Sequence, residues 1–501
     1  MLSMLAATMA MAAGETKIVT ASLFKNGYAM VVRKLAVTGN TTTTADIPQA
    51  ALGTFWITTT GDLKIVDLVA TQEERKSTSS PGTYPEFLAL NVGKEVSLTT
   101  VNLGEIKGKL LSVVGDTIMI ERAGTVLMIG FGEVRMITVG KDGVTTTTRS
   151  HMQRVLRFKT SGTGDLIMYG LERGMTWSPA YAIDLLDDKK LSLTAKSTVI
   201  NDLGELSDVD LKFVTGFPNV PWATLAEPLL SGQSVDQFTG FLASVGIPAA
   251  GFGGGRRDAM SQNMAPGSPA ADFGGGFEVN SGGGNQAEDL FFYKRDGITL
   301  KRGDRGFYIL FQAKSDYEHL YTVDLTDSIQ SNTRYVGGQE GPSDVWHSLK
   351  LKNNSGQPLT TAPVTVFKEG QILGQDTLMY TSAGAPLMVK MSKALDIRVE
   401  ATEEEVKRER SALRTPNGVV YDLVTLKGTI SMRSFKTTDV AMRIQKETTG
   451  EVVESTGAPA VVKLAKGLIE INPRSRLTWT PTLGAGKTME VTFTYKVYVN
   501  S

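Results

Sequence analysis

Apolar and polar residues alternate in short stretches along most of the chain. Segment 489–499, MEVTFTYKVYV, has an apolar side chain at every second position: Val491, Phe493, Tyr495, Val497 and Val499. A period of two is typical of a β-strand with one buried face. Similar runs, separated by Gly, Pro, Asn or Asp, recur in residues 17–70, 151–224 and 289–488. The pattern predicts a mostly β, multi-domain protein in which residues 150–501 build a β-sandwich.

Five short apolar runs follow one another closely between Asn91 and Val139, separated by Gly, Asn or Asp. Their number and spacing predict a small, strongly bent five-stranded barrel of the SH3-like or Sm-like kind near residues 90–140. Some barrels of this kind bind RNA or peptides, but these runs carry neither a row of aromatic side chains nor a basic stripe. We therefore expect a structural insert, and we expect no nucleic-acid partner.

One segment has the helical period instead. Ser234 and Gln237 form a capping box. Five apolar residues after Ser234 share one face of the helix that would begin there: Val235, Phe238, Phe241, Leu242 and Val245. Gly246 and Pro248 then end it. We expect this helix to pack on its own domain; docking to a partner is the alternative.

Three polar segments interrupt the strand pattern. Residues 71–85, TQEERKSTSSPGTYP, are typical of a linker. Residues 251–286 are rich in glycine and cannot bury enough apolar surface to offset the entropy of ordering them, so they are predicted to be a disordered loop. Residues 401–415, ATEEEVKRERSALRT, form either a short helix opened by Thr402 and Glu405 or an exposed strand.

These patterns divide the chain into six parts. They are a leader (1–13), an N-terminal β region (14–75), the small barrel (85–145), a first sandwich segment that ends in the helix (150–250), the glycine-rich loop (251–286) and the remaining sandwich segment (287–501). Within the leader, Ala10-Met11-Ala12 fits the small-residue pattern that precedes signal-peptidase cleavage. We interpret the leader as a clipped signal peptide. It predicts a secreted, periplasmic or cell-surface protein, with no transmembrane span in the mature chain.

Charge and composition exclude several kinds of chemistry. The chain has 52 basic and 52 acidic residues, so no whole-chain field favours nucleic acid or an anionic membrane. It has no cysteine, which excludes thiol nucleophiles, disulfides and Cys-zinc sites. Its three histidines, His151, His319 and His347, are not spaced as metal ligands. We expect no metal and no cofactor. Carboxylate pairs remain open, because their geometry depends on the tertiary fold.

Residues 484–488, GAGKT, resemble the end of a phosphate-binding loop. That motif needs a glycine at position 481, which is Pro481 here, and a helix beginning at Lys487. The strand pattern of residues 489–499 follows instead. We therefore interpret GAGKT as a turn between two antiparallel strands and expect it to bind no nucleotide.

Several blocks from about residue 150 to the C-terminus are similar to a known family. GMTWSPAYAIDL, STVINDLGELSDVDLKFVTGFPN and INPRSRLTWTPTLGAGKTMEVTFTYKVYV resemble the family called domain of unknown function 4139, typified by mucoidy-inhibitor-A-like proteins; residues 17–70 resemble its leader region. The resemblance implies an extracytoplasmic β-rich protein and carries over no catalytic residue. It marks seven positions as a structural family motif: Trp177, Pro179, Tyr181, Asn201, Gly216, Pro218 and Trp479.

Two functions are consistent with these observations. The first is an exported, non-enzymatic β-rich protein that acts as a binding or structural module of the bacterial envelope, with an envelope protein or a polysaccharide as its partner. The alternative is an extracytoplasmic hydrolase with a carboxylate-based site. Facing Asp and Glu side chains in a pocket would favour the hydrolase.

Overall fold

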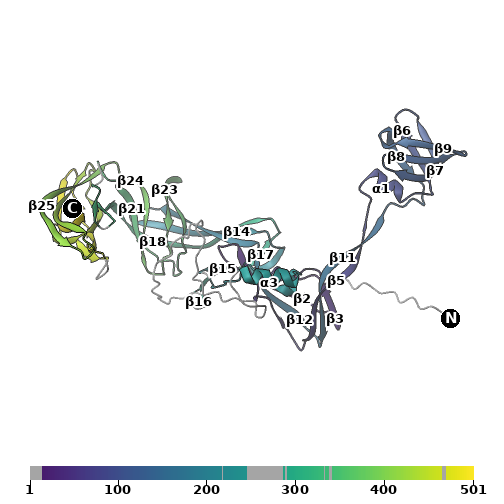
Figure 1. Cartoon of the computed structure of the whole chain (residues 1–501), viewed down its shortest axis with the longest axis horizontal. Coiled ribbons are helices and arrows are strands. Elements are labelled where there is room, and N and C mark those ends of the chain that lie inside the picture. Colours follow the sequence, from purple (N-terminus) through teal and green to yellow (C-terminus); the bar gives the residue numbers. More distant parts are fainter. Residues whose placement is uncertain are drawn as a thin grey trace. The chain divides into compact units, whose positions relative to one another are not determined.

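The computed structural model describes residues 14–216, 218–244, 286–287, 290–331, 333–337, 341–464 and 470–500. Strands dominate these ranges (Figure 1), which confirms the prediction of a mostly β protein. The α-helices among these residues are α1 (Tyr84–Ala89), α2 (Pro228–Ser231) and α3 (Val235–Ser244). The predicted leader and nearly all of the predicted glycine-rich loop lie outside the described residues. Within the described ranges, no helix has the length and apolar character needed to cross a membrane.

The chain forms two compact units that are interleaved in sequence. The first comprises residues 1–17, 33–168 and 226–240; the second comprises 18–32, 169–225 and 241–501. In the first unit, α3 begins as predicted. The Ser234 hydroxyl accepts the Gln237 amide proton at 3.2 Å, and the Gln237 side chain accepts the Ser234 amide proton at 3.0 Å. These two bonds are the reciprocal contacts of a capping box.

The linker was predicted at residues 71–85; a long two-stranded ribbon includes residues 71–79, and α1 begins at Tyr84. Strand β5 (Lys64–Ser79) pairs antiparallel with β11 (Thr147–Ser161), and β3 (Thr41–Thr44) pairs with β11 on its other side. The linker prediction was wrong for residues 71–79 because the outer half of β5 consists of polar residues on both faces and therefore lacks the apolar alternation of a half-buried strand. The inner half of the ribbon packs on a core that includes Leu35, Leu156 and Phe158.

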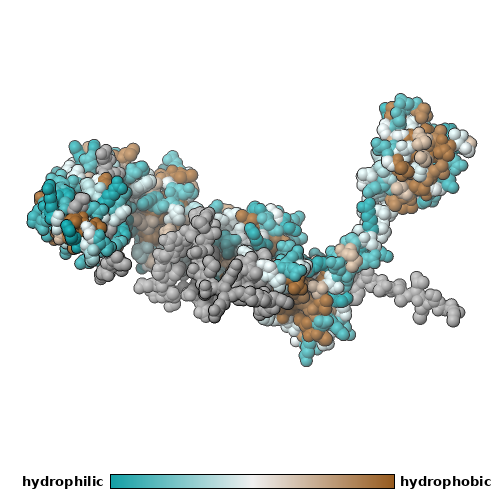
Figure 2. Space-filling view, in the orientation of Figure 1, coloured by the Kyte–Doolittle hydropathy of each residue, from teal (hydrophilic) through white to brown (hydrophobic). Residues whose placement is uncertain are grey.

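The small module has the five predicted strands. They are β6 (Glu95–Thr100), β7 (Glu105–Val114), β8 (Thr117–Arg122), β9 (Thr125–Gly130) and β10 (Val134–Val139), with a 3-10 turn, η1 (Phe131–Glu133), between the last two. The order β10-β6-β7-β8-β9 is that of an open sheet, since no pairing within residues 91–139 joins β9 to β10. The module has its own core, and apolar residues also reach its surface (Figure 2), among them Val126 and Met128.

One sheet runs through the N-terminal part of the fold in the order β16-β17-β15-β1-β2-β12-β4. Its strands are β1 (Lys17–Leu23), β2 (Tyr28–Ala36), β4 (Trp56–Thr59), β12 (Asp165–Arg173), β15 (Leu206–Thr215), β16 (Gln286–Ala287) and β17 (Leu290–Leu300). In the second unit, β1 lies parallel to β15, with Thr20 opposite Asp210. Side chains from these strands form a buried cluster with Trp177.

A second large sheet occupies the middle of the second unit. It includes β13 (Met175–Leu185), β14 (Lys190–Asn201), β18 (Arg305–Leu325), β21 (Trp346–Lys352), β22 (Ala362–Lys368), β23 (Gln371–Leu378) and β24 (Pro386–Lys393). We call the buried cluster on these strands the middle core. Its members include Tyr181, Tyr317, Leu349, Val364 and Val389.

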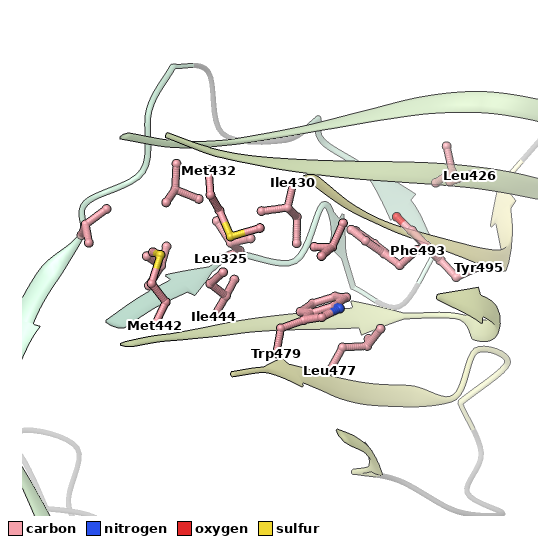
Figure 3. Packing of buried hydrophobic residues seen from close by; sticks show 14 of the residues in the cluster. Leu325, Leu426, Ile430, Met432, Met442, Ile444, Leu477, Trp479, Phe493 and Tyr495 are labelled. Carbon is pink, nitrogen blue, oxygen red and sulfur yellow. The ribbon is translucent and has the colours of Figure 1, made fainter. Parts of the chain in front are cut away.

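The same sheet continues into a C-terminal sandwich through β27 (Val440–Thr449), β29 (Ala460–Lys463), β30 (Arg474–Trp479) and β31 (Thr482–Leu483). The facing sheet has the order β25-β26-β32-β28, with bounds Ile397–Arg414, Val420–Ser434, Thr488–Asn500 and Glu451–Ser455. Strands β19 (Ile329–Gln330) and β20 (Arg334–Tyr335) pair with each other and form a separate two-stranded sheet. Between the two sheets is the C-terminal core (Figure 3), which includes Tyr321, Ile444, Trp479, Phe493 and Tyr495. This arrangement confirms the predicted sandwich.

The charged segment 401–415 forms most of β25, an edge strand of the facing sheet. The exposed-strand alternative is therefore confirmed for residues 401–414, and the helix opened by Thr402 and Glu405 is not formed. Charged side chains along an edge strand disfavour pairing with another chain. This role explains a charge run that lacks the apolar spacing of an amphipathic helix.

The GAGKT segment is a turn, as predicted, but it does not join a hydrogen-bonded pair of strands. It connects β31, which pairs with β27, to β32, which pairs with β26 and β28 in the facing sheet. The amide of Ala485 donates to the Asp439 carboxylate at 2.9 Å, and the amide of Gly486 donates to the Lys436 carbonyl at 3.1 Å. The turn is confirmed, but the two strands that it joins belong to different sheets, because periodicity identifies strands without saying which sheet they join.

Candidate functional site

The Trp-Ser-Pro-x-Tyr block lies on β13 and has its aromatic side chains in the interior. Trp177 is 1% exposed and stands 5.4 Å from Phe213 and 5.9 Å from Tyr293 between ring centroids. Its indole N–H donates to the Val214 carbonyl at 3.3 Å. Tyr181 is 4% exposed. Both residues are therefore part of the packed interior, and they position the neighbouring exposed residue Ser178 and buried residue Pro179.

Two tyrosine hydroxyls fasten the loop that precedes β22 to this block. The Tyr181 hydroxyl donates to the Thr360 carbonyl at 3.1 Å, and the Tyr293 hydroxyl donates to the Pro358 carbonyl. Burial raises the pKa of both hydroxyls well above the usual value for tyrosine. They remain protonated at any physiological pH, so both stay hydrogen-bond donors.

The loop is also closed on itself by a buried asparagine. The Asn353 side-chain amide donates to the carbonyls of Gln357, Thr381 and Ser382 at 2.8, 3.1 and 3.1 Å. Asn353 is 1% exposed. A buried amide that satisfies several backbone carbonyls holds an irregular loop in one conformation. The start of β22 is thereby fixed opposite β13.

The turn between β1 and β2 completes the site and supplies its charge. Gly27 has φ of +89°, a conformation that glycine adopts without strain. The turn is tied to β13 by the Thr176 hydroxyl, which donates to the Phe24 carbonyl at 3.0 Å, and by the Gly174 amide, which donates to the Gly27 carbonyl at 3.0 Å. Lys25 therefore projects from a fixed turn.

Lys25 is half-buried and is held by neutral oxygen atoms. Its ammonium donates to the Thr360 hydroxyl at 2.8 Å and to the Thr361 carbonyl at 3.1 Å. No carboxylate among the described residues forms an ion pair with it. An ammonium has three N–H donors, so one remains for another acceptor. Burial lowers the pKa of Lys25 below its ordinary value.

A pocket of about 290 Å³ opens beside Lys25. It is lined by Lys25, Thr176, Trp177, Ser178, Pro179, Thr361, Ala362 and Pro363. The lining combines one cation, three hydroxyls and apolar walls, and it contains no Asp, Glu or His. A proton-transfer pair of carboxylates is therefore not present in this lining. The chemistry available is recognition of a negatively charged or oxygen-rich group next to a small apolar one.

The other motif residues predicted from the sequence lie elsewhere in the second unit. Asn201 is buried; its side-chain amide donates to the carbonyls of Gly204, Leu300 and Lys301. Gly216 follows β15 with φ of +102°, and Pro218 is half-buried in irregular chain. Trp479 belongs to the C-terminal core and donates its indole N–H to Thr456 at 2.9 Å. Of the seven motif residues, Trp177 and Pro179 line the pocket, and Tyr181 lies on the same strand with its side chain in the middle core.

Sequence reasoning missed Lys25 and a pair of histidines. Lys25 and Thr360 are 335 positions apart, so no local spacing reports their contact. His319 and His347 are 28 positions apart, yet the antiparallel pairing of β18 with β21 places His319 Nδ1 at 2.8 Å from His347 Nε2. Across the described ranges, no group of three or more His, Asp or Glu side chains is arranged to hold a metal ion.

Comparisons with known proteins add no relative to this description. No protein-family model matches the chain, and a search of the curated proteins finds no match. The fold and the pocket together define a multi-domain β-rich protein with a small pocket at the junction of a turn, a strand and a loop. Its function is inferred from that geometry.

Proposed function

We propose that this chain is an exported, non-enzymatic binding module of the bacterial envelope, related to the domain of unknown function 4139 family, and that its pocket at Lys25 takes a carboxylate group. The observation that carries the proposal is the Lys25 ammonium. It is half-buried, lacks an ion-pair partner among the described residues and borders a pocket with one N–H unassigned. The carboxylate would belong to an envelope protein or a polysaccharide.

A carboxylate suits this site for two physical reasons. A half-buried ammonium that contacts only neutral oxygens gains a charge-assisted hydrogen bond, worth about 1.5–3 kcal/mol, when an anion enters. The walls formed by Pro179, Ala362 and Pro363 can at the same time cover a few methylene groups of the ligand. A ligand with a carboxylate on a short aliphatic stem meets both requirements.

The alternative function is an extracytoplasmic hydrolase with a carboxylate-based site. Such an enzyme needs two facing carboxyl groups, or one carboxylate beside a bound water, in a cavity that admits the substrate. The Lys25 pocket has no carboxylate in its lining. This observation favours binding over hydrolysis at this pocket.

The proposal is tested by titrating the protein with butyrate and, as a neutral comparison, butyramide, while NMR chemical shifts report binding. Butyrate should shift signals of Thr176, Ser178 and Thr361, and butyramide should not. Lys25→Met should abolish the shifts. Lys294→Met removes an exposed lysine of β17 in the same unit and should leave them unchanged. Equal shifts with butyramide, or shifts that survive Lys25→Met, would contradict carboxylate recognition by Lys25.

A second experiment separates binding from catalysis and identifies the partner class. Immobilised wild-type protein and the Lys25→Met variant are compared for retention of envelope proteins and of uronic-acid polysaccharides. Retention that depends on Lys25 supports the binding module and says which polymer carries the carboxylate. A hydrolase screen runs in parallel. Turnover of glycoside, peptide, ester or phosphate substrates that is lost when one Asp or Glu becomes Ala would establish the alternative.

A further inference from the structure

Two of the buried clusters of the second unit, the middle core and the C-terminal core, share strand β18. Strand β18 is 21 residues long. Its first part pairs with β14, from Arg305 to Asp316, and its last part pairs with β21 and β27. Tyr317 belongs to the middle core, whereas Tyr321 belongs to the C-terminal core. His319 lies between them on the same face of the strand.

Two imidazole rings on the paired strands β18 and β21 link a tyrosine of one core to a tyrosine of the other. His319 packs edge-on against Tyr317, with ring centroids 5.1 Å apart. His347 of β21 stacks on Tyr321 at 4.6 Å with an interplanar angle of 10°. The two imidazoles are joined by the 2.8 Å contact between Nδ1 of His319 and Nε2 of His347. Each core therefore presents a tyrosine to one member of the pair.

The charged groups near the pair are two lysines, each of which faces an aspartate. Lys436, from the segment between β26 and β27, acts on both histidines and stands 5.3 Å from the Tyr321 ring centroid. Lys368 of β22 and Asp188, from the β13–β14 loop, act on His319. Asp188 and Lys368 face each other at 3.7 Å, and Lys436 faces Asp396 at the same separation. Asp188 is the one anion among these groups that favours a charged imidazole.

The number of protons on the pair decides whether its bond can exist. With both rings neutral, one N–H donates to the other ring's bare nitrogen. With one added proton, an imidazolium N–H still donates to the neutral ring. With two added protons both facing nitrogens carry hydrogen, so the bond is lost and two like charges repel beside Lys436 and Lys368.

We infer that the His319–His347 pair is a proton-operated joint between the middle core and the C-terminal core. It is closed while the two rings share a hydrogen bond and opens when both rings are charged. Opening removes the imidazole contact that links the rings of Tyr317 and Tyr321 along β18, and it lets β18 bend so that the angle between the two cores changes. This joint is independent of the Lys25 pocket.

The direction of the pH response follows from the surroundings of the rings. Burial, together with Lys368 and Lys436, lowers the pKa of His319. Burial, His319 and Lys436 lower the pKa of His347 to about 4. An exposed imidazole in the open state titrates near pH 6.5. The open state therefore binds more protons below that pH. The free-energy difference that favours the closed state decreases progressively as the pH falls from about 6.5 towards 4.

The test measures the separation of the two cores directly. Because the chain has no cysteine, Ile372→Cys on β23 and Val453→Cys on β28 give two unique spin-label sites on exposed positions. Double electron–electron resonance should show one distance distribution at pH 7.5 and a shifted or broader one at pH 4.5. The same labels in a His347→Gln background, which cannot carry two imidazolium charges, should keep the neutral-pH distribution at pH 4.5.

Two controls keep the outcome decisive. His151→Gln removes the third histidine, which is exposed in β11 of the first unit, and should respond as the wild type does. If His347→Gln already differs from the wild type at pH 7.5, His319→Gln takes its place, and NMR titration of the wild-type imidazoles must show that the distance change follows the second protonation. An unchanged wild-type distance at pH 4.5, a response retained without either histidine, or a change that follows the first proton would overturn the joint.

Discussion

At the scale of single residues, Trp177 of the Trp-Ser-Pro-x-Tyr block contributes to the protein by packing in its interior. Its ring contacts Phe213 and Tyr293, and its N–H is used by Val214, so no polar atom of the side chain is left for a ligand. Trp177 touches the Lys25 pocket only as part of the wall. The role that we assign to it is to fix the backbone of Thr176 and Ser178.

Replacing Trp177 by Ala should lower the free energy of unfolding by about 3–5 kcal/mol, because a large buried aromatic side chain is removed and a cavity remains. Urea denaturation followed by circular dichroism measures the change. Trp177→Phe, which keeps an aromatic ring but loses the N–H donor, should cost less. If Trp177→Ala left stability unchanged while butyrate binding disappeared, Trp177 would belong to the ligand site and not to the packed interior.

At the scale of secondary-structure elements, a buried ion pair joins the two sheets of the C-terminal sandwich. Lys446 of β27 lies 2.9 Å from Glu403 of β25, and each side chain is 4% exposed. The Lys446 ammonium also donates to the Thr326 carbonyl at 2.7 Å, and the Tyr495 hydroxyl donates to Glu403 at 2.9 Å. The pair is thus embedded in further hydrogen bonds, which a buried ion pair needs to offset the loss of water.

Removing one charge of this pair should be more harmful than removing both. Glu403→Gln leaves the Lys446 ammonium buried without a counter-charge and should cost about 3–5 kcal/mol of unfolding free energy. The double variant Glu403→Gln/Lys446→Met should recover part of that loss. A double-mutant cycle in urea gives the coupling energy. Lys407→Met breaks the exposed pair with Glu409 on the same strand and should have no measurable effect. Additive single effects would contradict a coupled pair.

At the scale of the whole molecule, the local sequence pattern predicts where most strands lie but not which strands they pair with. Alternation located the strands of residues 91–139 and 489–499 because each has one buried face. It failed for residues 71–79, which form part of a ribbon but carry polar side chains on both faces. The alternation pattern also does not predict the contact between Lys25 and Thr360 or the contact between the two histidines. Both contacts depend on pairings between segments that are distant in sequence.

The small module offers a prediction at this scale. It has a core of its own, and Asn91 ties its two ends together: the side chain donates to the Val144 carbonyl at 2.9 Å and accepts the Val144 amide proton at 2.7 Å. A fragment of residues 80–146 should therefore fold alone, although such a short chain is only marginally stable. Dispersed amide NMR signals would show folding. Asn91→Ala should collapse the dispersion, and a wild-type fragment without dispersion would contradict an autonomous module.

Strand β18 has a consequence for which sequence changes the second unit can accept. Side chains at odd positions of its last part, Tyr317 to Leu325, point into the two cores, and His319 shares that face. Insertion or deletion of one residue near Asp316 would leave the first part of the strand in place and turn every later side chain to the opposite face. Tyr321, Val323 and Leu325 would then leave the C-terminal core. Length variation around β18 should therefore be confined to the turns that flank it, because this one continuous strand supplies side chains to two hydrophobic cores in a fixed register.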